Sequence, residues 1–304
     1  MATVIVFDEY GGPEVLHPVD VPDPQAGPGQ VRIRVKAAGV QPFDCGTRRG
    51  DFANYVPLEF PARLGNEVAG IVDQKGPDVT GIEEGEEVIA YMRMEGYADT
   101  VVVPSDQAGR KPATMPWEEA GVLSASGQTA WTALDELAVG PGDTLLIHAA
   151  AGGVGSFAVQ VARARGATVI GTASERNHDY LRSLGATPVT YGPGLADRVR
   201  AVAVDGVDAA LDAVGGEALD VSLDLIGSTD RIVTIADWAN SARLGIRRVG
   251  TDRSLDKLAG LASLYQDGCL KVEVSKVFPL GKASDAHREV ETGHVRGKVA
   301  LMVE

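Results

Sequence analysis

The 304-residue sequence is poor in cysteine and in positive charge, and each shortage excludes a class of protein. Its two cysteines, Cys45 and Cys269, are too few for a disulfide framework or a four-thiolate zinc site, so we expect free thiols. The 28 basic residues are outnumbered by 42 acidic ones, and the formal net charge of −14 would repel nucleic acid or an anionic membrane. We therefore expect neither a nucleic-acid nor a membrane partner.

Long apolar runs and several catalytic motifs are also missing. No segment approaches the roughly 20 apolar residues that a membrane-spanning helix needs. Residues Met1–Tyr10 lack the basic-then-apolar pattern of a signal peptide, so we expect a cytoplasmic protein. The sequence contains no Gly-x-Ser-x-Gly motif and no P-loop, which argues against a hydrolase or a kinase. With 44% hydrophobic and 23% charged residues, the chain is typical of a globular protein, and its length suggests two domains.

What the sequence does contain is a glycine-rich turn between an apolar strand and an apolar helix. The expected strand Thr144–His148 leads through this turn to the expected helix Gly155–Arg165. Glycines allow backbone N–H groups to approach a pyrophosphate, and the N-terminus of the helix favours the anion. A second strand, Thr168–Ala173, completes the order found in dinucleotide-binding units. The candidate cofactor-binding residues of the turn are Gly152, Gly153, Val154 and Gly155.

The pattern of the chain changes near Pro116. Short strands separated by glycine and proline turns predict a twisted, barrel-like β domain over residues 1–115. Residues 116–269 begin with a helical pattern over Trp117–Leu137 and then alternate strands with helices, which predicts a doubly wound parallel sheet of the Rossmann type. The tail, residues 270–304, returns to strand, short helix and strand, and we expect it to complete the first domain.

The individual elements follow from periodicity and turn residues. The expected strands are Ala2–Asp8, Gln30–Val40, Glu67–Gln74, Glu87–Tyr91, Ala98–Val103, Thr144–His148, Thr168–Ala173, Pro188–Tyr191, Gly206–Asp212, Arg231–Ile235 and Gly245–Thr251. The expected helices after the glycine turn are Gly155–Arg165, Arg176–Leu184, Ala196–Val204, Glu217–Leu225 and Ser254–Asp267. Residues Pro18–Pro28 are expected to form a proline-rich connection.

Four segments together give the chain a resemblance to a known family. They are Gly39–Asp44, Leu64–Gly70, Ala149–Gly155 and Gly293–Lys298. The chain resembles the medium-chain dehydrogenase/reductases, within the zinc-free quinone oxidoreductase (zeta-crystallin-like) branch, over essentially its whole length. The resemblance implies a GroES-like catalytic domain built from both ends of the chain, an inserted Rossmann domain, and an active site in the cleft between them. It also implies a homodimer, formed through the strand near Gly245–Thr251.

Zinc-dependent members of this family carry metal ligands where this chain has other residues. Gln41 stands in place of a cysteine, Asn66 in place of a histidine, and Ala125 in place of a second cysteine. An amide and a methyl group cannot replace a thiolate and an imidazole, so we predict no metal site. Asp44 and Glu67 remain from the zinc pattern, and a salt bridge or a helix cap is their expected role. Without zinc to stabilise an alkoxide, an electron-poor quinone or enone is a more suitable substrate than an alcohol.

The residues after the second strand of the Rossmann domain favour NADPH over NADH. NAD-specific sites usually place Asp or Glu here, about 20 residues beyond the glycines. Ser174 and Asn177 can donate hydrogen bonds to a 2′-phosphate, and Arg176 can neutralise its charge. Glu175 would repel the phosphate, so we expect its side chain to face solvent. The alternative for Arg176 is an ordinary surface position in the first turn of a helix.

The family resemblance adds further cofactor candidates. Tyr191 matches a position beside the adenosine 2′-phosphate, with a solvated tyrosine at the sheet edge as an equal alternative. Thr129 matches a position near the nicotinamide, and the turns after the fourth and fifth strands lie at the sheet edge where dinucleotides bind. Lys298 lies beside the cleft in the family and can reach a phosphate, although a surface lysine is the commoner outcome. The candidates from these positions are Thr129, Tyr191, Val214, Ile235, Ala236 and Lys298.

Two side chains are candidates for the donor that stabilises negative charge on the substrate carbonyl. Gln41 stands where relatives carry an asparagine that faces the substrate, with a longer side chain. Tyr55 lies three residues beyond the position of the family tyrosine, which Phe52 occupies here. Water is the open alternative as proton source. His148 is expected to be a satisfied core histidine, and His287 is assigned no catalytic partner.

The sequence thus predicts an NADPH-dependent, zinc-independent reductase of quinones or α,β-unsaturated carbonyls. An enoyl or enone reductase of a biosynthetic pathway is the alternative within enzymes, and it differs in the shape of the substrate cleft. The expected lining of this cleft is Phe43, Phe52, Tyr55, Tyr91, Met92 and Trp238. A non-catalytic NADPH-binding protein is the alternative outside enzymes, since the residues at 41 and 52 differ from the family pattern.

Overall fold

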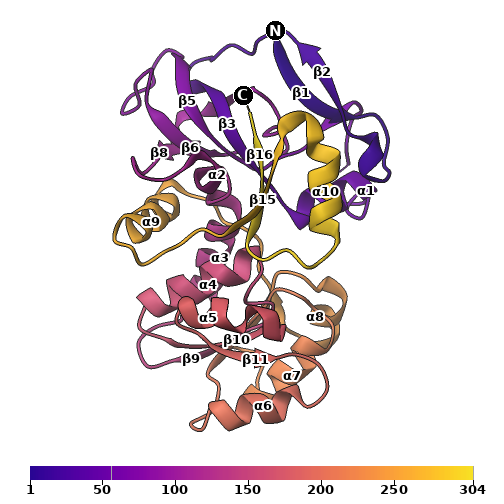
Figure 1. Ribbon diagram of the computed structural model, residues 1–304, viewed down its shortest axis with the longest axis vertical. Helices are drawn as coiled ribbons and strands as arrows, with labels where there is room; N and C mark the ends of the chain where they lie inside the picture. Colours follow the sequence, from indigo (N-terminus) through magenta and orange to yellow (C-terminus); the bar gives the residue numbers. More distant parts are fainter. Residues whose placement is uncertain (56, 304) are drawn as a thin grey trace. The chain divides into compact units, whose positions relative to one another are not determined.

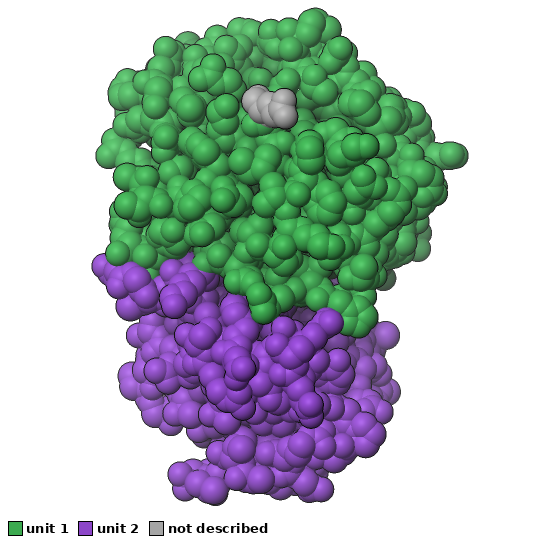
Figure 2. Space-filling view, in the orientation of Figure 1, with its two compact units in different colours: residues 1–125, 253–266, 272–304 green, residues 126–252, 267–271 purple. Residues whose placement is uncertain are grey.

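The computed structural model describes residues 1–55 and 57–303 and divides into two compact units (Figure 1). Unit 1 comprises residues 1–125, 253–266 and 272–304, and unit 2 comprises residues 126–252 and 267–271 (Figure 2). Each unit contains its own cluster of buried apolar side chains. In the described part of the chain, no helix is long and apolar enough to cross a membrane.

Unit 1 consists mainly of antiparallel strands, as expected for a GroES-like domain. Its larger sheet has seven strands in the order β15-β16-β3-β5-β6-β8, with β7 paired to β3, and its smaller sheet has the order β2-β1-β4. The strands are β1 (Ala2–Phe7), β2 (His17–Val21), β3 (Gln30–Val40), β4 (Ala62–Arg63), β5 (Glu67–Lys75), β6 (Glu87–Tyr91), β7 (Thr100–Pro104), β8 (Ala108–Arg110), β15 (Val274–Pro279) and β16 (Lys298–Met302). The helices are α1 (Pro42–Arg49), α2 (Trp117–Ala120), α9 (Leu255–Gln266) and α10 (Ala283–Glu291).

Strand β3 shows how the sequence builds this sheet. Val31, Ile33 and Val35 are buried, whereas the basic residues between them are not, which is the alternation of a strand with one face in the core. Each buried side chain of this size contributes about 1.5–3 kcal/mol. The end of β3 pairs antiparallel with β16, with Val40 opposite Val299, so the yellow β16 lies beside the indigo β3 in Figure 1. The last strand of the chain therefore belongs to the sheet that the N-terminal part begins.

Unit 2 is a Rossmann domain. Its six-stranded sheet has the order β11-β10-β9-β12-β13-β14 with parallel pairing throughout, which is the order of a doubly wound dinucleotide-binding sheet. The strands are β9 (Thr144–Ile147), β10 (Thr168–Ala173), β11 (Thr187–Thr190), β12 (Ala209–Asp212), β13 (Ile232–Thr234) and β14 (Arg247–Arg248). The helices are α3 (Ser124–Glu136), which starts at the end of unit 1, α4 (Gly153–Ala164), α5 (His178–Ser183), α6 (Leu195–Val202), α7 (Glu217–Ile226) and α8 (Trp238–Leu244).

Several expected elements were wrong in detail. The helical pattern over Trp117–Leu137 is two helices, α2 and α3, and between them the chain passes β3 so closely at Gly121 that a Cβ there would lie 2.8 Å from the backbone carbon of Ala37. The proline-rich connection contains β2, whose residues pair with β1. The expected strand Gly245–Thr251 shortens to Arg247–Arg248, since only these two residues pair with β13. Helices α1 and α8 were not expected.

Candidate functional site

The glycine turn of unit 2 brings the backbone of α4 close to the end of β9. Ala149 adopts a positive φ of 53°, and Gly152 precedes the first residue of α4. A Cβ at Gly155 would lie 2.7 Å from the Cα of Ala150, so only glycine allows the helix to approach the turn this closely. The N-terminus of α4 carries N–H groups that its own carbonyls do not satisfy, which makes it suitable for a pyrophosphate.

One buried carboxylate shapes the turns at the carboxyl ends of two neighbouring strands. Asp212 ends β12 and accepts hydrogen bonds from the backbone N–H groups of Val214, at 3.0 Å, and Gly215, at 2.8 Å. Its second oxygen accepts the hydroxyl of Thr234, at 2.6 Å, on β13. The Thr234 hydroxyl oxygen in turn accepts from the backbone N–H of Ala236, at 3.0 Å. The candidates Val214 and Ala236 are thus held by side chains, whereas the N–H of Ile235 donates to the backbone carbonyl of Asp212, at 3.0 Å.

The candidates for the 2′-phosphate lie at the ends of two paired strands. Ser174 follows β10 and Tyr191 follows β11, and the last residues of these strands, Ala173 and Thr190, are partners in the parallel register. The amide nitrogen of Asn177 is 3.4 Å from the Ser174 hydroxyl.

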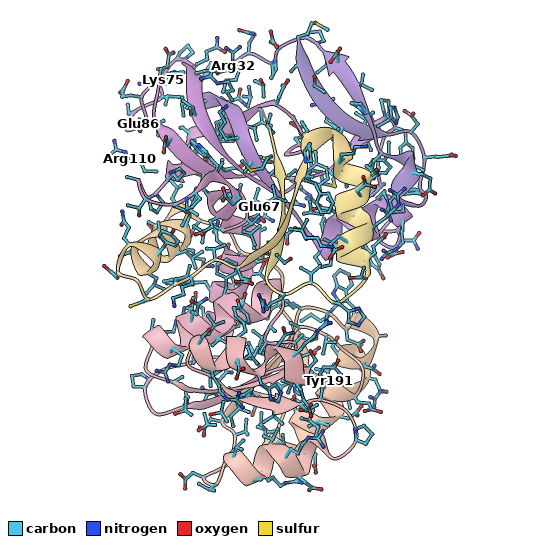
Figure 3. All side chains as sticks on the ribbon, in the orientation of Figure 1. Arg32, Glu67, Lys75, Glu86, Arg110 and Tyr191 are labelled. Atoms are coloured by element: carbon cyan, nitrogen blue, oxygen red, sulfur yellow. The ribbon has the colours of Figure 1, made fainter. Side chains whose placement is uncertain are left out.

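The side chains around this strand end are open to solvent. Arg176 and Glu175 are exposed, and Tyr191, which Figure 3 labels, is 57% exposed. The structure therefore brings Ser174 and Tyr191 to one corner of the sheet, with Arg176 two residues further along the chain. Thr129, from α3, is 2.6 Å from the hydroxyl of Thr251.

In unit 1, the buried carboxylate of Glu67 lies at the start of β5 (Figure 3). It accepts hydrogen bonds from the side-chain amide of Gln41 and from the backbone N–H of Ala125, at 2.6 Å. The ammonium of Lys298, on β16, is 3.3 Å away and is also buried. Burial lowers the pKa of Lys298, and the charge of Glu67 opposes this shift. Lys298 is thus a buried partner of Glu67, and the alternative of a surface lysine was wrong.

A second buried carboxylate, Asp44, caps helix α1. It accepts from the backbone N–H of Gln41, at 2.8 Å, from the amide of Asn66, at 2.7 Å, and from the hydroxyl of Tyr97, at 3.1 Å. Burial raises the pKa of Asp44 to about 6, although the hydrogen bonds from Gln41 and Tyr97 and the charge of Lys298 lower it. The roles expected for the two carboxylates, a helix cap and a salt bridge, are both found.

Arg253 supplies a second, half-buried cation to this region. Its guanidinium donates to the carbonyl oxygens of Asn66, at 3.0 Å, and Met92, at 2.7 Å. Burial lowers its pKa, and the charges of Glu67 and Asp44 oppose that shift. In this region of unit 1, the negative charges of Asp44 and Glu67 thus lie near the positive charges of Lys298 and Arg253.

Among residues 1–55 and 57–303, no group of three or more histidine, cysteine, aspartate or glutamate side chains is arranged to hold a metal ion.

The comparisons with known proteins agree with this architecture. Residues 27–175 match the family described as alcohol dehydrogenase GroES-like domain, and residues 184–301 match the zinc-binding dehydrogenase family. Quinone oxidoreductase from Mus musculus is 30% identical over 328 residues, covering 100% of this chain and 97% of that protein. The chain belongs to the medium-chain dehydrogenase/reductase superfamily. It is an oxidoreductase of the quinone oxidoreductase branch.

Other relatives of this dehydrogenase/reductase differ in what they are reported to do. The 2-haloacrylate reductase of a Burkholderia species is 33% identical over 332 residues, 99% of each chain. Polyketide synthase GfsB of Streptomyces halstedii is 33% identical over 290 residues, and the match spans 90% of this chain but only 5% of that much longer protein. These names leave the substrate of the present chain to be argued from its own residues.

Solved structures extend the likeness to the whole fold. The quinone oxidoreductase of Coxiella burnetii has a TM-score of 0.88 at 33% identity, and the alignment covers 100% of this chain and 99% of that one. The Escherichia coli quinone oxidoreductase complexed with NADPH has a TM-score of 0.87 at 27% identity, with 99% of each chain covered.

The two catalytic candidates of this reductase lie in different surroundings. Gln41 is 8% exposed and hydrogen-bonded to both buried carboxylates, whereas Tyr55, in the turn after α1, is 71% exposed. Between them in sequence, Phe43 and Phe52 stack with ring centroids 5.2 Å apart and planes inclined by 18°. Phe43 is 37% exposed, so part of this stacked pair is open to solvent.

Sequence reasoning missed three polar residues of unit 1, which are the buried Tyr97 and His287 and the half-buried Arg253. Each is single in its stretch of sequence, and nothing in the local pattern marks it as buried. His148, by contrast, is the satisfied core histidine that we expected: it is buried, its Nε2 is 3.0 Å from the Ser222 hydroxyl, and burial lowers its pKa to about 4.

Proposed function

We propose that this protein is an NADPH-dependent reductase that transfers a hydride to a quinone or another α,β-unsaturated carbonyl compound without a bound metal. The observation that carries the proposal is how the zinc-ligand positions are filled. Gln41, Asn66 and Ala125 each donate a hydrogen bond to a buried carboxylate. Because Asp44 and Glu67 receive these donors, they hold neighbouring groups in place and do not act as ligands. An electron-poor acceptor suits such a site, since the negative charge that develops on it is delocalised.

The residues of unit 2 fit NADPH. The N-terminus of α4 suits the pyrophosphate, and Ser174, Arg176 and Tyr191 suit the 2′-phosphate because they combine hydrogen-bond donors with one positive charge. The Escherichia coli relative solved with NADPH supports this choice. When bound, NADPH supplies the hydride. The other residues that we propose to contact it are Thr129, Gly152, Gly153, Val154, Gly155, Asn177, Val214, Ile235 and Ala236.

Gln41 is our proposed donor to the carbonyl oxygen of the acceptor. A primary amide carries two N–H groups, and the hydrogen bond to Glu67 fixes the direction of one of them. An oriented donor stabilises the oxyanion that forms as the hydride arrives. Gln41 has other interactions in the structure, and a bound substrate has to compete with them. Tyr55 is the alternative donor, and its exposed hydroxyl leaves room for water to supply the proton instead.

The stacked Phe43–Phe52 pair favours a planar acceptor. Aromatic rings prefer offset stacking, and a quinone ring offers such a face, whereas a linear enoyl chain does not. The full-length likeness to a 2-haloacrylate reductase favours the second candidate, a reductase of small enones. The third candidate, a protein that binds NADPH without catalysis, rests on the departures from the family pattern at Gln41 and Phe52.

One set of assays separates these candidates. The purified chain, dialysed against a chelator, is given NADPH with benzoquinone, naphthoquinone or an α,β-unsaturated ketone, and NADPH oxidation is followed by absorbance. We expect turnover with at least one quinone, and a fall in kcat/KM on the order of 10²-fold in Gln41→Ala, since one oriented donor is lost. Gln266→Ala, an exposed glutamine on α9, is the matched control.

The outcomes assign the function as follows. Turnover with the enone alone would support the second candidate, and NADPH binding without oxidation of NADPH by any acceptor would support the third. Activity that disappears on chelation and returns with zinc would contradict the metal-independent mechanism.

A further inference from the structure

A chain of buried polar side chains connects Asp44 with the C-terminal helix α10. The hydroxyl of Tyr97 is 3.1 Å from Oδ2 of Asp44 and 3.1 Å from Nε2 of His287. The other ring nitrogen of His287, Nδ1, is 3.2 Å from Nη1 of Arg48. Each of these four side chains is at most 1% exposed, so water does not compete for their hydrogen bonds. We call Arg48, His287, Tyr97 and Asp44 the polar chain.

The donor and acceptor groups of its members allow the hydrogen bonds of the polar chain to run in only one direction, from Arg48 to Asp44. A guanidinium can only donate, so Nδ1 of His287 accepts from Arg48 and the ring carries its proton on Nε2. That Nε2–H donates to the oxygen of Tyr97, and the one hydroxyl proton of Tyr97 is then directed to Asp44. The ring stays neutral, because burial and the charges of Arg48 and Arg49 lower the pKa of His287 to about 3.

Both ends of the polar chain lie on α1, one helical turn apart. Arg48 is anchored by Glu291 of α10, at 2.5 Å, and by the carbonyl oxygen of Gly11, at 3.1 Å. Asp44, at the other end, receives the backbone N–H of Gln41. The polar chain therefore leaves α1 at Arg48, passes through α10 and the loop that carries Tyr97, and returns to α1 at the residue that holds Gln41.

We propose that Tyr97 and His287 are positioning residues, which keep Asp44 directed at the backbone of Gln41 and thereby aim the Gln41 amide at the substrate carbonyl. This proposal rests on the proposed role of Gln41 as donor. A carboxylate accepts a stronger hydrogen bond from the Gln41 N–H than a neutral carboxyl group does, so the contact depends on the charge of Asp44. The other ionisable groups that interact with Asp44 are Lys298, Arg253 and Cys45.

Loss of the Tyr97 hydroxyl removes one of the hydrogen bonds that lower the pKa of Asp44, so that pKa rises above about 6 in Tyr97→Phe. The backbone amide proton of Gln41 reports the charge of Asp44 in an NMR titration of the full-length protein. We expect the midpoint of this titration to move to higher pH in Tyr97→Phe and to stay unchanged in Tyr10→Phe, a control that removes another tyrosine hydroxyl of unit 1. An unchanged midpoint in Tyr97→Phe would overturn the proposal, and this readout needs no enzymatic activity.

Activity provides the second readout. In Tyr97→Phe we expect kcat/KM for a quinone to fall several-fold at pH 6 and to match the wild type at pH 8, with unchanged NADPH affinity. His287→Gln keeps an acceptor towards Arg48 and a donor towards Tyr97, so it should retain the wild-type pH profile, whereas His287→Leu should resemble Tyr97→Phe.

The protonation state and tautomer of His287 report the direction of these hydrogen bonds in the wild type, so this test needs no variant. Long-range ¹⁵N spectra of the wild type should show His287 as the neutral Nε2–H form from pH 8 to pH 5, with its signals absent from His287→Gln. A protonated ring or the Nδ1–H form would overturn the proposal even if His287→Leu fails to fold. A protein that reduces no acceptor would remove the proposed function, and the Gln41 titration would still decide the positioning role.

Discussion

Individual residues decide how unit 1 accommodates two buried carboxylates. Leaving a buried charge unpaired costs several kcal/mol, and Asp44 and Glu67 avoid this through hydrogen bonds and through the nearby cations Lys298 and Arg253. The sequence indicated the roles of the two carboxylates, a helix cap and a salt bridge, because both residues belong to a recognisable family pattern. It did not indicate Arg253, since a single arginine before a helix carries no local signal of its contacts with the carbonyl oxygens of Asn66 and Met92.

Breaking the buried Glu67–Lys298 pair should be strongly destabilising, because the remaining charge would stay buried without its partner. Lys298→Met leaves Glu67 without its salt-bridge partner, and we expect a loss of about 3–5 kcal/mol in the free energy of unfolding in urea. Lys276→Met breaks the exposed pair with Glu289 and should cost at most about 1 kcal/mol. Adding Glu67→Gln to Lys298→Met should recover part of the loss. A stable Lys298→Met protein with weakened NADPH binding would instead support the phosphate contact implied by the family.

Arg176 should determine the preference for NADPH. Arg176→Ala removes the positive charge proposed to face the 2′-phosphate, and we expect the Kd for NADPH to rise about tenfold, equivalent to about 1.4 kcal/mol. The Kd for NADH, which lacks this phosphate, should not change. Arg182→Ala is the control, because Arg182 is exposed on α5 and paired with Asp179. Equal effects on both cofactors, measured by fluorescence titration, would rule out the phosphate contact.

Among the elements of the fold, α4 is a helix whose position depends on a single residue, Gly155. Its apolar residues predict a helix in this region, but its distance from the turn after β9 depends on Gly155. Helix α1 was missed for the opposite reason: it has eight residues, and only Cys45 among them is apolar and buried. Its cap, Asp44, and its final glycine, Gly50 with φ of 89°, were visible in the sequence as single residues.

Gly155→Ala should impair both stability and cofactor binding. The new Cβ would lie 2.7 Å from the Cα of Ala150, so the helix has to move away from the turn, at a cost of about 1–3 kcal/mol. We expect a lower urea midpoint and a higher Kd for NADPH. Gly140→Ala is the control, because a Cβ at Gly140 meets no atom within 4 Å in the described structure. Wild-type affinity in Gly155→Ala would argue against the close approach of α4 to the turn.

At the scale of the whole molecule, buried histidines should make the protein sensitive to acid. Burial lowers the pKa of His148 to about 4 and that of His287 to about 3, whereas an unfolded histidine titrates near 6.5. Their contribution to stability is therefore present above about pH 6.5 and is lost as the pH falls. Asp44, with its pKa raised to about 6, acts in the opposite direction and offsets one of the two histidines between about pH 4 and 6.

With two histidines acting in one direction and Asp44 in the other, we expect the free energy of unfolding to fall by about 1.4 kcal/mol per pH unit as the pH falls from 6 towards 4.5. Urea unfolding at pH 7.5, 6 and 5 measures it. His148→Gln keeps a donor for Ser222 and should flatten this dependence, while His294→Gln, at an exposed position, should not. A wild-type stability that does not change over this range would show that the two histidines are not held neutral.

The quaternary structure remains the prediction that the family resemblance implies. Strand β14 lies at an edge of the sheet in unit 2, and pairing of two such edges would protect them from uncontrolled association. Sedimentation equilibrium should give twice the 31.7 kDa mass of one chain over a range of dilutions. A mass of one chain at the highest concentration would contradict the homodimer.

The sequence by itself determined the class of fold and the family, because these depend on local patterns: strand and helix periods, a glycine turn, and short motifs that can be recognised residue by residue. It also identified the replaced zinc-ligand positions. Only the tertiary structure decided what the replacements contact, since Gln41, Glu67, Ala125 and Lys298 come from four distant parts of the chain. The polar chain through Tyr97 and His287 was likewise decided only by the tertiary structure, because a hydrogen bond between residues 190 positions apart produces no periodic pattern in the sequence.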